Sequence, residues 1–222
     1  MTQQMSDAPL DCPLCTGSAA GRFAEVGARR YLRCPTCLLT FLHPADRLSP
    51  VEERARYETH ENDPADRRYR AFLDRLAVPL AERLTEGMHG LDFGSGPGPT
   101  LSVMMEERGF FMSLYDPFFA PDRAVLERHY DFVTCTETAE HFFHPGEDFH
   151  RLSTLLRSPG WLGIMTQRMD DDGGFPDWWY ARDPTHVAFY RTETLEWIAQ
   201  AYGWILETPS ETVAIFHRTA ES

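Results

Sequence analysis

The sequence predicts an α/β fold: a doubly wound, mostly parallel sheet with a C-terminal antiparallel hairpin, preceded by a small module built around four cysteines. Three observations support this prediction. After residue 87 strand-like apolar runs alternate with helical patterns, two short apolar runs joined by a turn close the chain, and two cysteine pairs stand near its beginning. The 222 residues can bury one large core and carry one small accessory module. We expect boundaries at 1–45 for the cysteine module, 46–87 for a helical linker or lid, and 88–222 for the α/β domain.

Four of the five cysteines form two C-x-x-C pairs, Cys12 with Cys15 and Cys34 with Cys37. Each pair supplies two thiolates from one tight turn, so two such turns can complete the tetrahedron that structural Zn²⁺ prefers. A disulfide pair and a redox motif are the alternatives, and a reducing compartment disfavours disulfides. We therefore predict a structural zinc site with no open position. The fifth cysteine, Cys135, lies in an apolar strand-like run and should be buried.

The first 87 residues contain short elements. Residues 21–26 and 30–33 alternate between apolar and polar side chains, which predicts a hairpin between the cysteine pairs. Ser49-Pro50 predicts the start of one helix, and a second helix carries apolar residues at helical spacing from Tyr69 to Leu80. The polar and aromatic stretch 57–62 between them is either a surface loop or a lid over a ligand site.

The remaining residues alternate between strand and helix. Strands are expected at 90–93, 110–115, 131–136 and 161–166, helices after Gly98, around 124–128, near 147–157 and over 192–202, and two last strands at 204–207 and 212–217. This alternation predicts a parallel sheet with helices on both faces, whereas the turn between the last two strands makes them antiparallel. An acidic and aromatic insertion, 168–186, interrupts the pattern. Four aromatic residues within it form either a packed flap or a substrate wall.

The composition excludes several kinds of chemistry. All 21 basic residues are arginine, so a lysine Schiff base, a lysine nucleophile and a P-loop lysine are impossible. The net charge of −13 is uneven: residues 1–90 hold 12 arginines and 13 acids, and residues 91–222 hold 9 arginines and 21 acids. This balance argues against a nucleic-acid partner, although six arginines at 22, 29, 30, 33, 67 and 68 could form a local basic patch. No apolar run is long enough to span a membrane, so we expect a cytoplasmic protein without a membrane partner.

A glycine-rich turn follows the first strand of the α/β part. It contains Asp92, Gly94, Gly96 and Gly98, whereas a dinucleotide-binding turn requires a third glycine where this chain has Pro99. A strand, a glycine-rich turn and a helix N-terminus form a cradle for a nucleotide-like ligand, because glycine lets the backbone approach closely. The acid before the turn suits a ligand with a positively charged amino group.

Together with three later motifs, this turn resembles the class I S-adenosylmethionine-dependent methyltransferases, which have a Rossmann-like fold. The motifs are residues 91–98, 115–117, 130–137 with 140–141, and 155–162. The chain is most similar to a bacterial group that carries an N-terminal zinc ribbon. The resemblance covers 88–217 and extends forward through the cysteine module.

The resemblance implies roles for particular residues. Asp92 should lie near the amino group of the cofactor, Asp116 should accept hydrogen bonds from both ribose hydroxyls, and Thr136 and Glu137 should border the sulfonium and the substrate. The cofactor-binding residues it implies are Asp92, Gly94, Ser95, Gly96, Gly98, Asp116, Pro117, Thr136 and Glu137. This chain departs from the family at one point, because only 14 residues separate Asp116 from Asp131. The family's third strand has little room there, and we expect that sheet edge to be shortened.

Methyl transfer from a sulfonium is an in-line displacement in which the protein mainly aligns the reactants. An oxygen or nitrogen acceptor can need a general base, and histidine is the natural one near neutral pH. His141 and His186 are our catalytic candidates, His144 is a further one, and the alternative for His141 is a hydrogen bond that only holds its loop.

Three functions compete. The first is a methyltransferase acting on a small molecule. The second is an RNA methyltransferase whose zinc ribbon docks on RNA, and the third is a non-catalytic module that binds the cofactor or a protein partner. The acidic catalytic half and the aromatic insertion favour the first.

Overall fold

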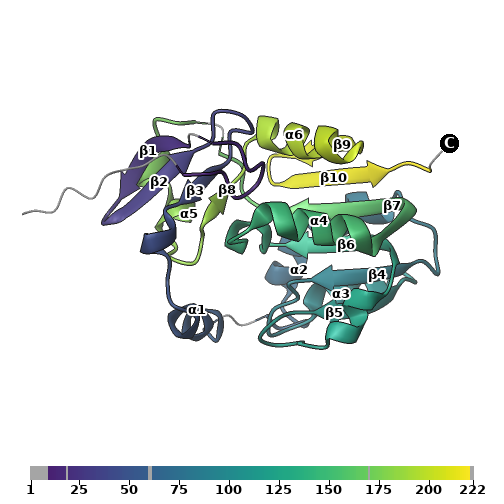
Figure 1. Ribbon diagram of the computed structural model, residues 1–222. Helices are drawn as coiled ribbons and strands as arrows, with labels where there is room; N and C mark the ends of the chain where they lie inside the picture. The colour runs from purple at the N-terminus through teal and green to yellow at the C-terminus, as the bar shows by residue number, and fades with distance from the viewer. Residues whose placement is uncertain (1–9, 19, 60–61, 170, 221–222) are drawn as a thin grey trace, which may run out of the picture.

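The structure is a computed structural model that describes residues 10–18, 20–59, 62–169 and 171–220 (Figure 1). Its strands form a six-stranded sheet in the order β5-β4-β6-β7-β10-β9 and a four-stranded sheet in the order β1-β2-β3-β8. The six-stranded sheet lies on the right in Figure 1, and the four-stranded sheet lies beside it on the left. His60 and Glu61 of the predicted lid, and Asp170 of the acidic insertion, lie outside the described residues.

The large sheet confirms the predicted α/β fold. Its parallel strands are β4 (His89–Phe93), β5 (Phe111–Tyr115), β6 (Tyr130–Thr136) and β7 (Leu156–Met165), and the antiparallel pair is β10 (Val213–Arg218) and β9 (Ile205–Ser210). β5 is the outermost strand at its edge. The shortened edge that we expected is therefore present among the described strands.

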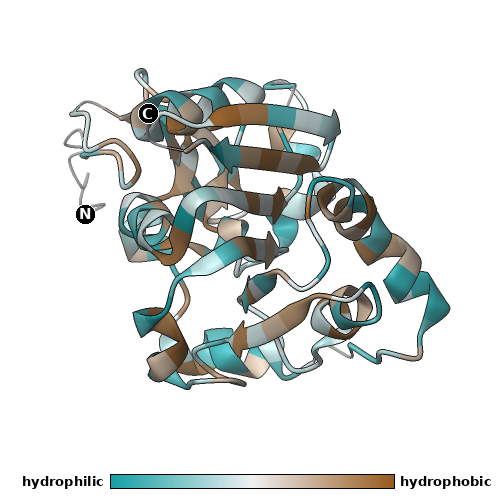
Figure 2. Ribbon diagram, turned by 90° about the vertical axis from the view of Figure 1, so that its right-hand side faces the viewer, coloured by the Kyte–Doolittle hydropathy of each residue, from teal (hydrophilic) through white to brown (hydrophobic). Residues whose placement is uncertain are grey.

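Helices cover both faces of this sheet. They are α2 (Arg67–Ala81) and α3 (Thr100–Glu106) on one face, and α4 (Pro145–Leu155), α6 (Thr192–Tyr202) and the 3-10 turn η2 (Arg123–Glu127) on the other. Neighbouring side chains of β6 alternate between the faces, with Phe132 packed under α2 and α3 and Val133 on the α4 side. Gly163 of β7 leaves room for α2, because a Cβ there would lie 2.9 Å from Leu76. Figure 2 shows the resulting apolar strands between more polar helices.

The first helix begins where the sequence predicts. Helix α1 (Pro50–Tyr57) has a capping box, in which Ser49 Oγ accepts the Glu52 N–H and the Glu52 carboxylate accepts the Ser49 N–H. No residue of α1 is fully buried. The helix stands at the edge of the body and follows the 3-10 turn η1 (Pro44–Asp46).

The small sheet combines segments that are far apart in sequence. Its strands are β1 (Gly21–Val26), β2 (Arg29–Arg33), β3 (Thr40–Leu42) and β8 (Ala188–Phe189). The predicted hairpin is β1 with β2, and β3 pairs on its other side with β8. The sequence did not predict this last pairing, because a two-residue strand has no periodicity to detect.

The aromatic insertion is both a packed flap and a wall. It contains the 3-10 turn η4 (Phe175–Asp177) and the short helix α5 (Trp179–Arg182). Phe175 is fully buried against Tyr31 and Phe189 of the small sheet. Trp179, in contrast, is 64% exposed and lines a cavity. No helix within the described ranges has both the length and the apolar character to cross a bilayer, and Cys135 is fully buried, as predicted.

Candidate active site

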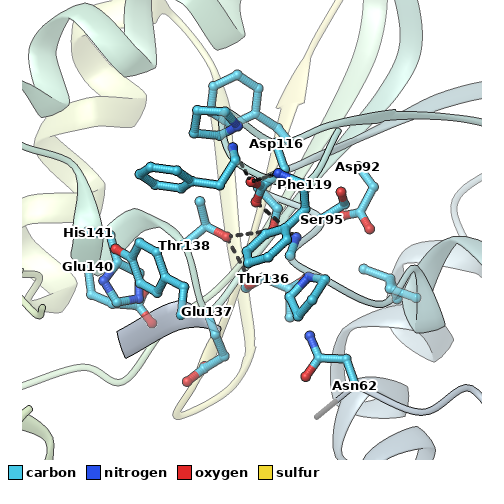
Figure 3. A pocket seen from close by; sticks show the side chains of 18 of the residues that line it. Asn62, Asp92, Ser95, Asp116, Phe119, Thr136, Glu137, Thr138, Glu140 and His141 are labelled. Carbon is cyan, nitrogen blue, oxygen red and sulfur yellow. Dashed lines mark hydrogen bonds between the residues drawn. The ribbon is translucent and has the colours of Figure 1, made fainter. Parts of the chain in front are cut away.

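A cavity of about 610 Å³ opens where the parallel strands β4, β5 and β6 end (Figure 3). This is the edge of a parallel sheet at which ligands enter. Every residue that the sequence placed in the cofactor or catalytic set lines it: Asp92, Gly94, Ser95, Gly96, Gly98, Asp116, Pro117, Thr136, Glu137, His141 and His186. His144, the further candidate, is not a lining residue; it is the N-cap residue of helix α4.

The glycine turn has a backbone that other residues would strain. Gly94 and Gly96 adopt φ angles of 80° and 65°, in the left-handed region. At Gly98 the constraint is space, because a Cβ would lie 2.0 Å from the carbonyl oxygen of Asn62. The turn is thus an open cradle, with Asn62 from the segment between α1 and α2 packed against it. The position of Asn62 was not predicted from the sequence.

Asp92 lies beneath this turn and is 4% exposed. Its two oxygens accept hydrogen bonds from Thr134 Oγ1 at 2.8 Å and Ser102 Oγ at 3.3 Å. Burial raises the pKa of Asp92 to about 6, against the effect of these two hydroxyls. A cationic group placed near Asp92 would therefore stabilise the ionised form of this carboxylate.

Asp116 ties the end of β5 to the glycine turn. Its Oδ2 accepts the Gly96 N–H at 3.0 Å, and its Oδ1 accepts the N–H groups of Phe118 and Phe119 at 2.8 and 3.0 Å. The side chain is 7% exposed. Three N–H partners hold the carboxylate in one orientation and leave further lone-pair capacity on Oδ2 for a hydroxyl.

The loop after β6 contains two buried carboxylates. Glu137 has a φ of 48°, and its Oε1 is buried without a hydrogen-bond partner, as is Thr136 Oγ1. Burial, and then the neighbouring Glu140, raise the pKa of Glu137 to about 9. Glu140 is fully buried, and its Oε2 accepts the Thr166 hydroxyl at 2.9 Å. Glu140 was missed as a site residue; the available signal was its place beside His141 at a strand end.

The structure brings the two predicted histidines together. The ring centroids of His141 and His186 are 4.9 Å apart, although 45 positions separate them in sequence. Each ring is oriented through Nδ1, which contacts the carbonyl oxygen of Thr185 at 2.9 Å in His141 and that of Tyr180 at 2.7 Å in His186. Burial lowers the pKa of His186, which favours its neutral form.

Helix α1 closes one side of the cavity. Tyr57 lies edge-on to His141 with a centroid distance of 5.2 Å and contacts Phe118 at 5.7 Å. Arg56 forms an ion pair of 2.7 Å with Asp183 of the insertion. Burial opposes ionisation of Asp183, but hydrogen bonds from Arg56 and Thr185 outweigh it and hold its pKa well below the usual range.

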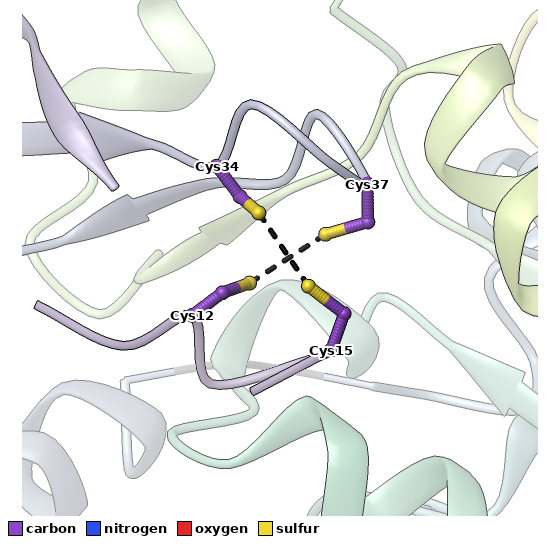
Figure 4. A group of neighbouring side chains, drawn as sticks. All are labelled: Cys12, Cys15, Cys34 and Cys37. Carbon is purple, nitrogen blue, oxygen red and sulfur yellow. Dashed lines mark hydrogen bonds between the residues drawn. The ribbon is translucent and has the colours of Figure 1, made fainter. Parts of the chain in front are cut away.

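The four paired cysteines converge on one point (Figure 4). The Sγ atoms of Cys12 and Cys37, and those of Cys15 and Cys34, are 3.5 Å apart. All five cysteines of the chain are free thiols. A tetrahedron of sulfurs at a Zn–S distance of about 2.3 Å has edges of about 3.8 Å, so this donor set fits zinc. Backbone N–H groups of Leu14, Gly17 and Thr36 point at three of the sulfurs, each at 3.4 Å.

Comparison with known proteins gives the family of the chain. The model of a methyltransferase-domain family matches residues 60–208, which is 149 of 222 residues. No curated protein matches the chain.

Three solved structures share the fold. The first is the 1,6-didemethyltoxoflavin-N1-methyltransferase of Burkholderia thailandensis, solved with bound 1,6-didemethyltoxoflavin and S-adenosylhomocysteine. It is 14% identical in sequence, with a TM-score of 0.56, and the match covers 90% of this chain and 100% of that one. A Bacillus halodurans protein is 17% identical, with a TM-score of 0.50 over 62% of this chain and 71% of its own. A Pyrococcus horikoshii protein is 12% identical, with a TM-score of 0.50 over 75% and 99%. The family match and the shared fold identify the chain as a member of the class I S-adenosylmethionine-dependent methyltransferases.

Proposed function

We propose that this protein transfers a methyl group from S-adenosylmethionine to a small molecule held in the cavity. Gly94, Ser95, Gly96 and Gly98 would hold the methionine part of the cofactor, with Asp92 near its amino group. Asp116 and Pro117 would hold the ribose, and Thr136 and Glu137 would border the sulfonium and the acceptor. When bound, the cofactor supplies a methyl group that is already activated for displacement. The protein's task is to align the acceptor and exclude water.

The charge of the cavity wall is the observation from which we infer the chemical class of the methyl acceptor. Its lining includes seven carboxylic acids, Glu53, Asp92, Asp116, Glu137, Glu140, Asp148 and Asp183, and one arginine, Arg151. Glu137 is protonated near neutral pH because of its raised pKa, but the other acids still outnumber the single arginine. Such a wall repels a phosphate backbone and suits a neutral or cationic molecule. Trp179, Tyr180 and Tyr57 add aromatic surface on the side of the two histidines.

The six arginines considered as an RNA-binding patch do not support that alternative. Arg22 pairs with Glu25, Arg30 with Asp46, and Arg33 with Asp172. Arg29 donates to the carbonyl oxygens of three consecutive insertion residues, 181–183. Four of the six guanidinium groups are thus engaged within the protein, which favours an acceptor other than nucleic acid.

His141 and His186 are the groups best placed to act on an acceptor proton. Both line the cavity, and in both Nδ1 faces a carbonyl oxygen. Because a carbonyl only accepts, Nδ1 carries the hydrogen and Nε2 of the neutral ring holds a free lone pair. Either Nε2 could take a proton from an acceptor hydroxyl or amine.

The cysteine cluster would hold a structural Zn²⁺. Four thiolates complete a tetrahedron and leave no position for a substrate. The cluster also lies within the packed body, because the Gly146 N–H at the start of α4 donates to the Pro13 carbonyl at 3.0 Å. A scaffolding role explains this contact better than a role in docking a partner.

Incubation with S-adenosylmethionine carrying a tritiated methyl group tests the proposal. We expect label to enter the small-molecule fraction of a cell extract, and RNA from the same extract to remain unlabelled. The Asp116→Ala variant should lose the transfer and bind S-adenosylhomocysteine at least tenfold more weakly, whereas Asp122→Ala, at an exposed turn, should behave like the parent. Label in RNA would support the second function, and cofactor binding without any labelled product would support a non-catalytic module.

A further inference from the structure

Three potential metal ligands meet at the acceptor end of the cavity. They are the Glu140 carboxylate, His141 and His186, and one ligand atom from each lies within 4.8 Å of the others. Glu140 and His141 belong to the 3-10 turn η3 (Ala139–His141) after β6, and His186 precedes β8. This cluster is separate from the four cysteines.

Both imidazoles are held as metal-binding histidines usually are. The Nδ1–H of His141 donates to the Thr185 carbonyl at 2.9 Å, and the Nδ1–H of His186 donates to the Tyr180 carbonyl at 2.7 Å. A second bond of this kind fixes the tautomer and the ring orientation of a ligating histidine. It leaves Nε2 of each ring as the coordinating atom.

Glu140 gives a second indication of a cation site, independent of the orientation of the two histidines. The residue is 0% exposed; its Oε2 accepts the Thr166 hydroxyl at 2.9 Å, and the Tyr180 hydroxyl also interacts with the carboxylate. Its Oε1 is buried with no hydrogen-bond partner, and the described ion pairs include none between Glu140 and a basic side chain. A fully buried carboxylate oxygen without a partner is costly. A cation bound beside it would remove that cost.

We propose that Glu140, His141 and His186 bind a divalent transition-metal ion through the Glu140 carboxylate and the two Nε2 atoms. Two imidazoles and one carboxylate suit Mn²⁺, Fe²⁺, Co²⁺ or Zn²⁺, whereas Mg²⁺ and Ca²⁺ prefer an all-oxygen set. Three protein ligands leave coordination positions open, and because the three residues line the cavity, a molecule in the cavity could occupy those positions.

The site narrows the acceptor class. A bound ion would lower the pKa of an acceptor hydroxyl placed at an open position, so that the hydroxyl would lose its proton to solvent more readily and its oxygen would become a better nucleophile. We therefore expect the acceptor to carry an ionisable oxygen, with a second donor atom beside it to occupy another open position. This inference rests on the proposed function, because it assigns the acceptor to this end of the cavity.

Direct metal binding tests the proposal. The full-length protein, with its cysteine site loaded with zinc, is titrated with Mn²⁺ while free Mn²⁺ is followed by electron paramagnetic resonance, and Zn²⁺ is then used to displace bound Mn²⁺. We expect one additional ion per chain. Glu140→Gln and His186→Gln should each weaken its affinity at least tenfold, and Glu147→Gln, an exposed carboxylate on α4, should leave the affinity unchanged.

Binding of S-adenosylhomocysteine to the same samples distinguishes a failure of the metal proposal from a failure of the proposed function. It should be unaltered in Glu140→Gln, which also shows that the variant is folded. The metal proposal is overturned if neither ion binds beyond the zinc of the cysteine site, or if Glu140→Gln binds Mn²⁺ as the parent does. If S-adenosylhomocysteine binds in those cases, the failure is confined to the metal site, and transfer of the tritiated methyl group decides the proposed function separately. If the folded parent protein does not bind it, the proposed function itself fails.

Discussion

Buried acids determine the chemistry of this cavity at the scale of single residues. Asp92 is almost inaccessible, and burial raises its pKa to about 6 from a usual value near 4. Between these values the folded protein retains a proton that the unfolded chain has lost. The stability of the ligand-free protein should therefore fall as the pH rises from about 4 through about 6. A cationic amino group near Asp92 would favour the ionised form and oppose this loss.

The pH dependence of cofactor binding follows from this pKa. We expect the affinity for S-adenosylhomocysteine to fall as the pH is lowered through about 6, by up to about tenfold per pH unit, because one proton must leave Asp92 on binding. Calorimetry between pH 5 and 8 measures this slope. Asp92→Asn should bind more weakly at pH 8 and show little of the slope. An equal slope in the parent and the variant would assign the titration to another group.

At the scale of elements, the glycine turn and the segment after α1 form one unit. The Thr100 hydroxyl at the start of α3 donates to the Asn62 carbonyl at 3.3 Å, and Gly98 lies directly beneath the same carbonyl. A side chain at position 98 would therefore displace the segment that covers the turn. A second contact, the ion pair between Arg56 and Asp183, joins helix α1 to the insertion.

Gly98→Ala tests this unit. Its Cβ would meet the Asn62 carbonyl at 2.0 Å, so we expect the affinity for S-adenosylhomocysteine to fall at least tenfold and the protein to lose about 1–3 kcal/mol of stability. Gly21→Ala is the matched control, because nothing lies within 4 Å of its Cβ position. Thermal unfolding and calorimetry measure both quantities. Equal behaviour of the two variants would show that the segment yields freely and is not part of the cofactor cradle.

At the scale of the whole molecule, the cysteine module supports the part of the cavity wall that carries His186. The Leu42 N–H of β3 donates to the Val187 carbonyl at 2.8 Å, directly after His186. Arg29 donates to the carbonyl of Ala181, and the Tyr31 hydroxyl contacts the same oxygen at 3.3 Å. The small sheet thus holds the insertion that carries His186. Cys12 and Cys34 also belong to the same buried cluster as the strands of the large sheet.

Loss of the cysteine site should therefore affect stability and the histidine site together. We expect Cys37→Ser to lose the zinc ion of the cysteine site and at least about 3 kcal/mol of stability, which corresponds to about 10 °C in Tm. It should also weaken Mn²⁺ binding at the histidine cluster. Cys135→Ala, another buried cysteine, is the control and should retain zinc. Full zinc content in Cys37→Ser, measured by elemental analysis, would contradict the four-cysteine site.

The sequence predicted the sheet, its short edge and the position of the glycine turn, and the structure agrees with these predictions. Each depends on a local signal: apolar periodicity marks the strands and helices, and the turn needs glycine because Gly94 and Gly96 have positive φ angles. The capping box at Ser49 is local in the same sense. Interpretation of such signals needs only neighbouring residues.

The tertiary structure decided the rest. It placed β8 beside β3 and Asn62 over Gly98, and it brought His186 to Glu140 and His141 across 45 residues of chain. Such contacts depend on how elements that are distant in the chain pack together. A single sequence does not show which distant residue will contact which. The raised pKa values of Asp92 and Glu137 have the same origin, since the burial that causes them exists only in the folded protein. The sequence by itself therefore determined which cofactor class the fold holds, whereas packing determined which groups line the cavity beside it.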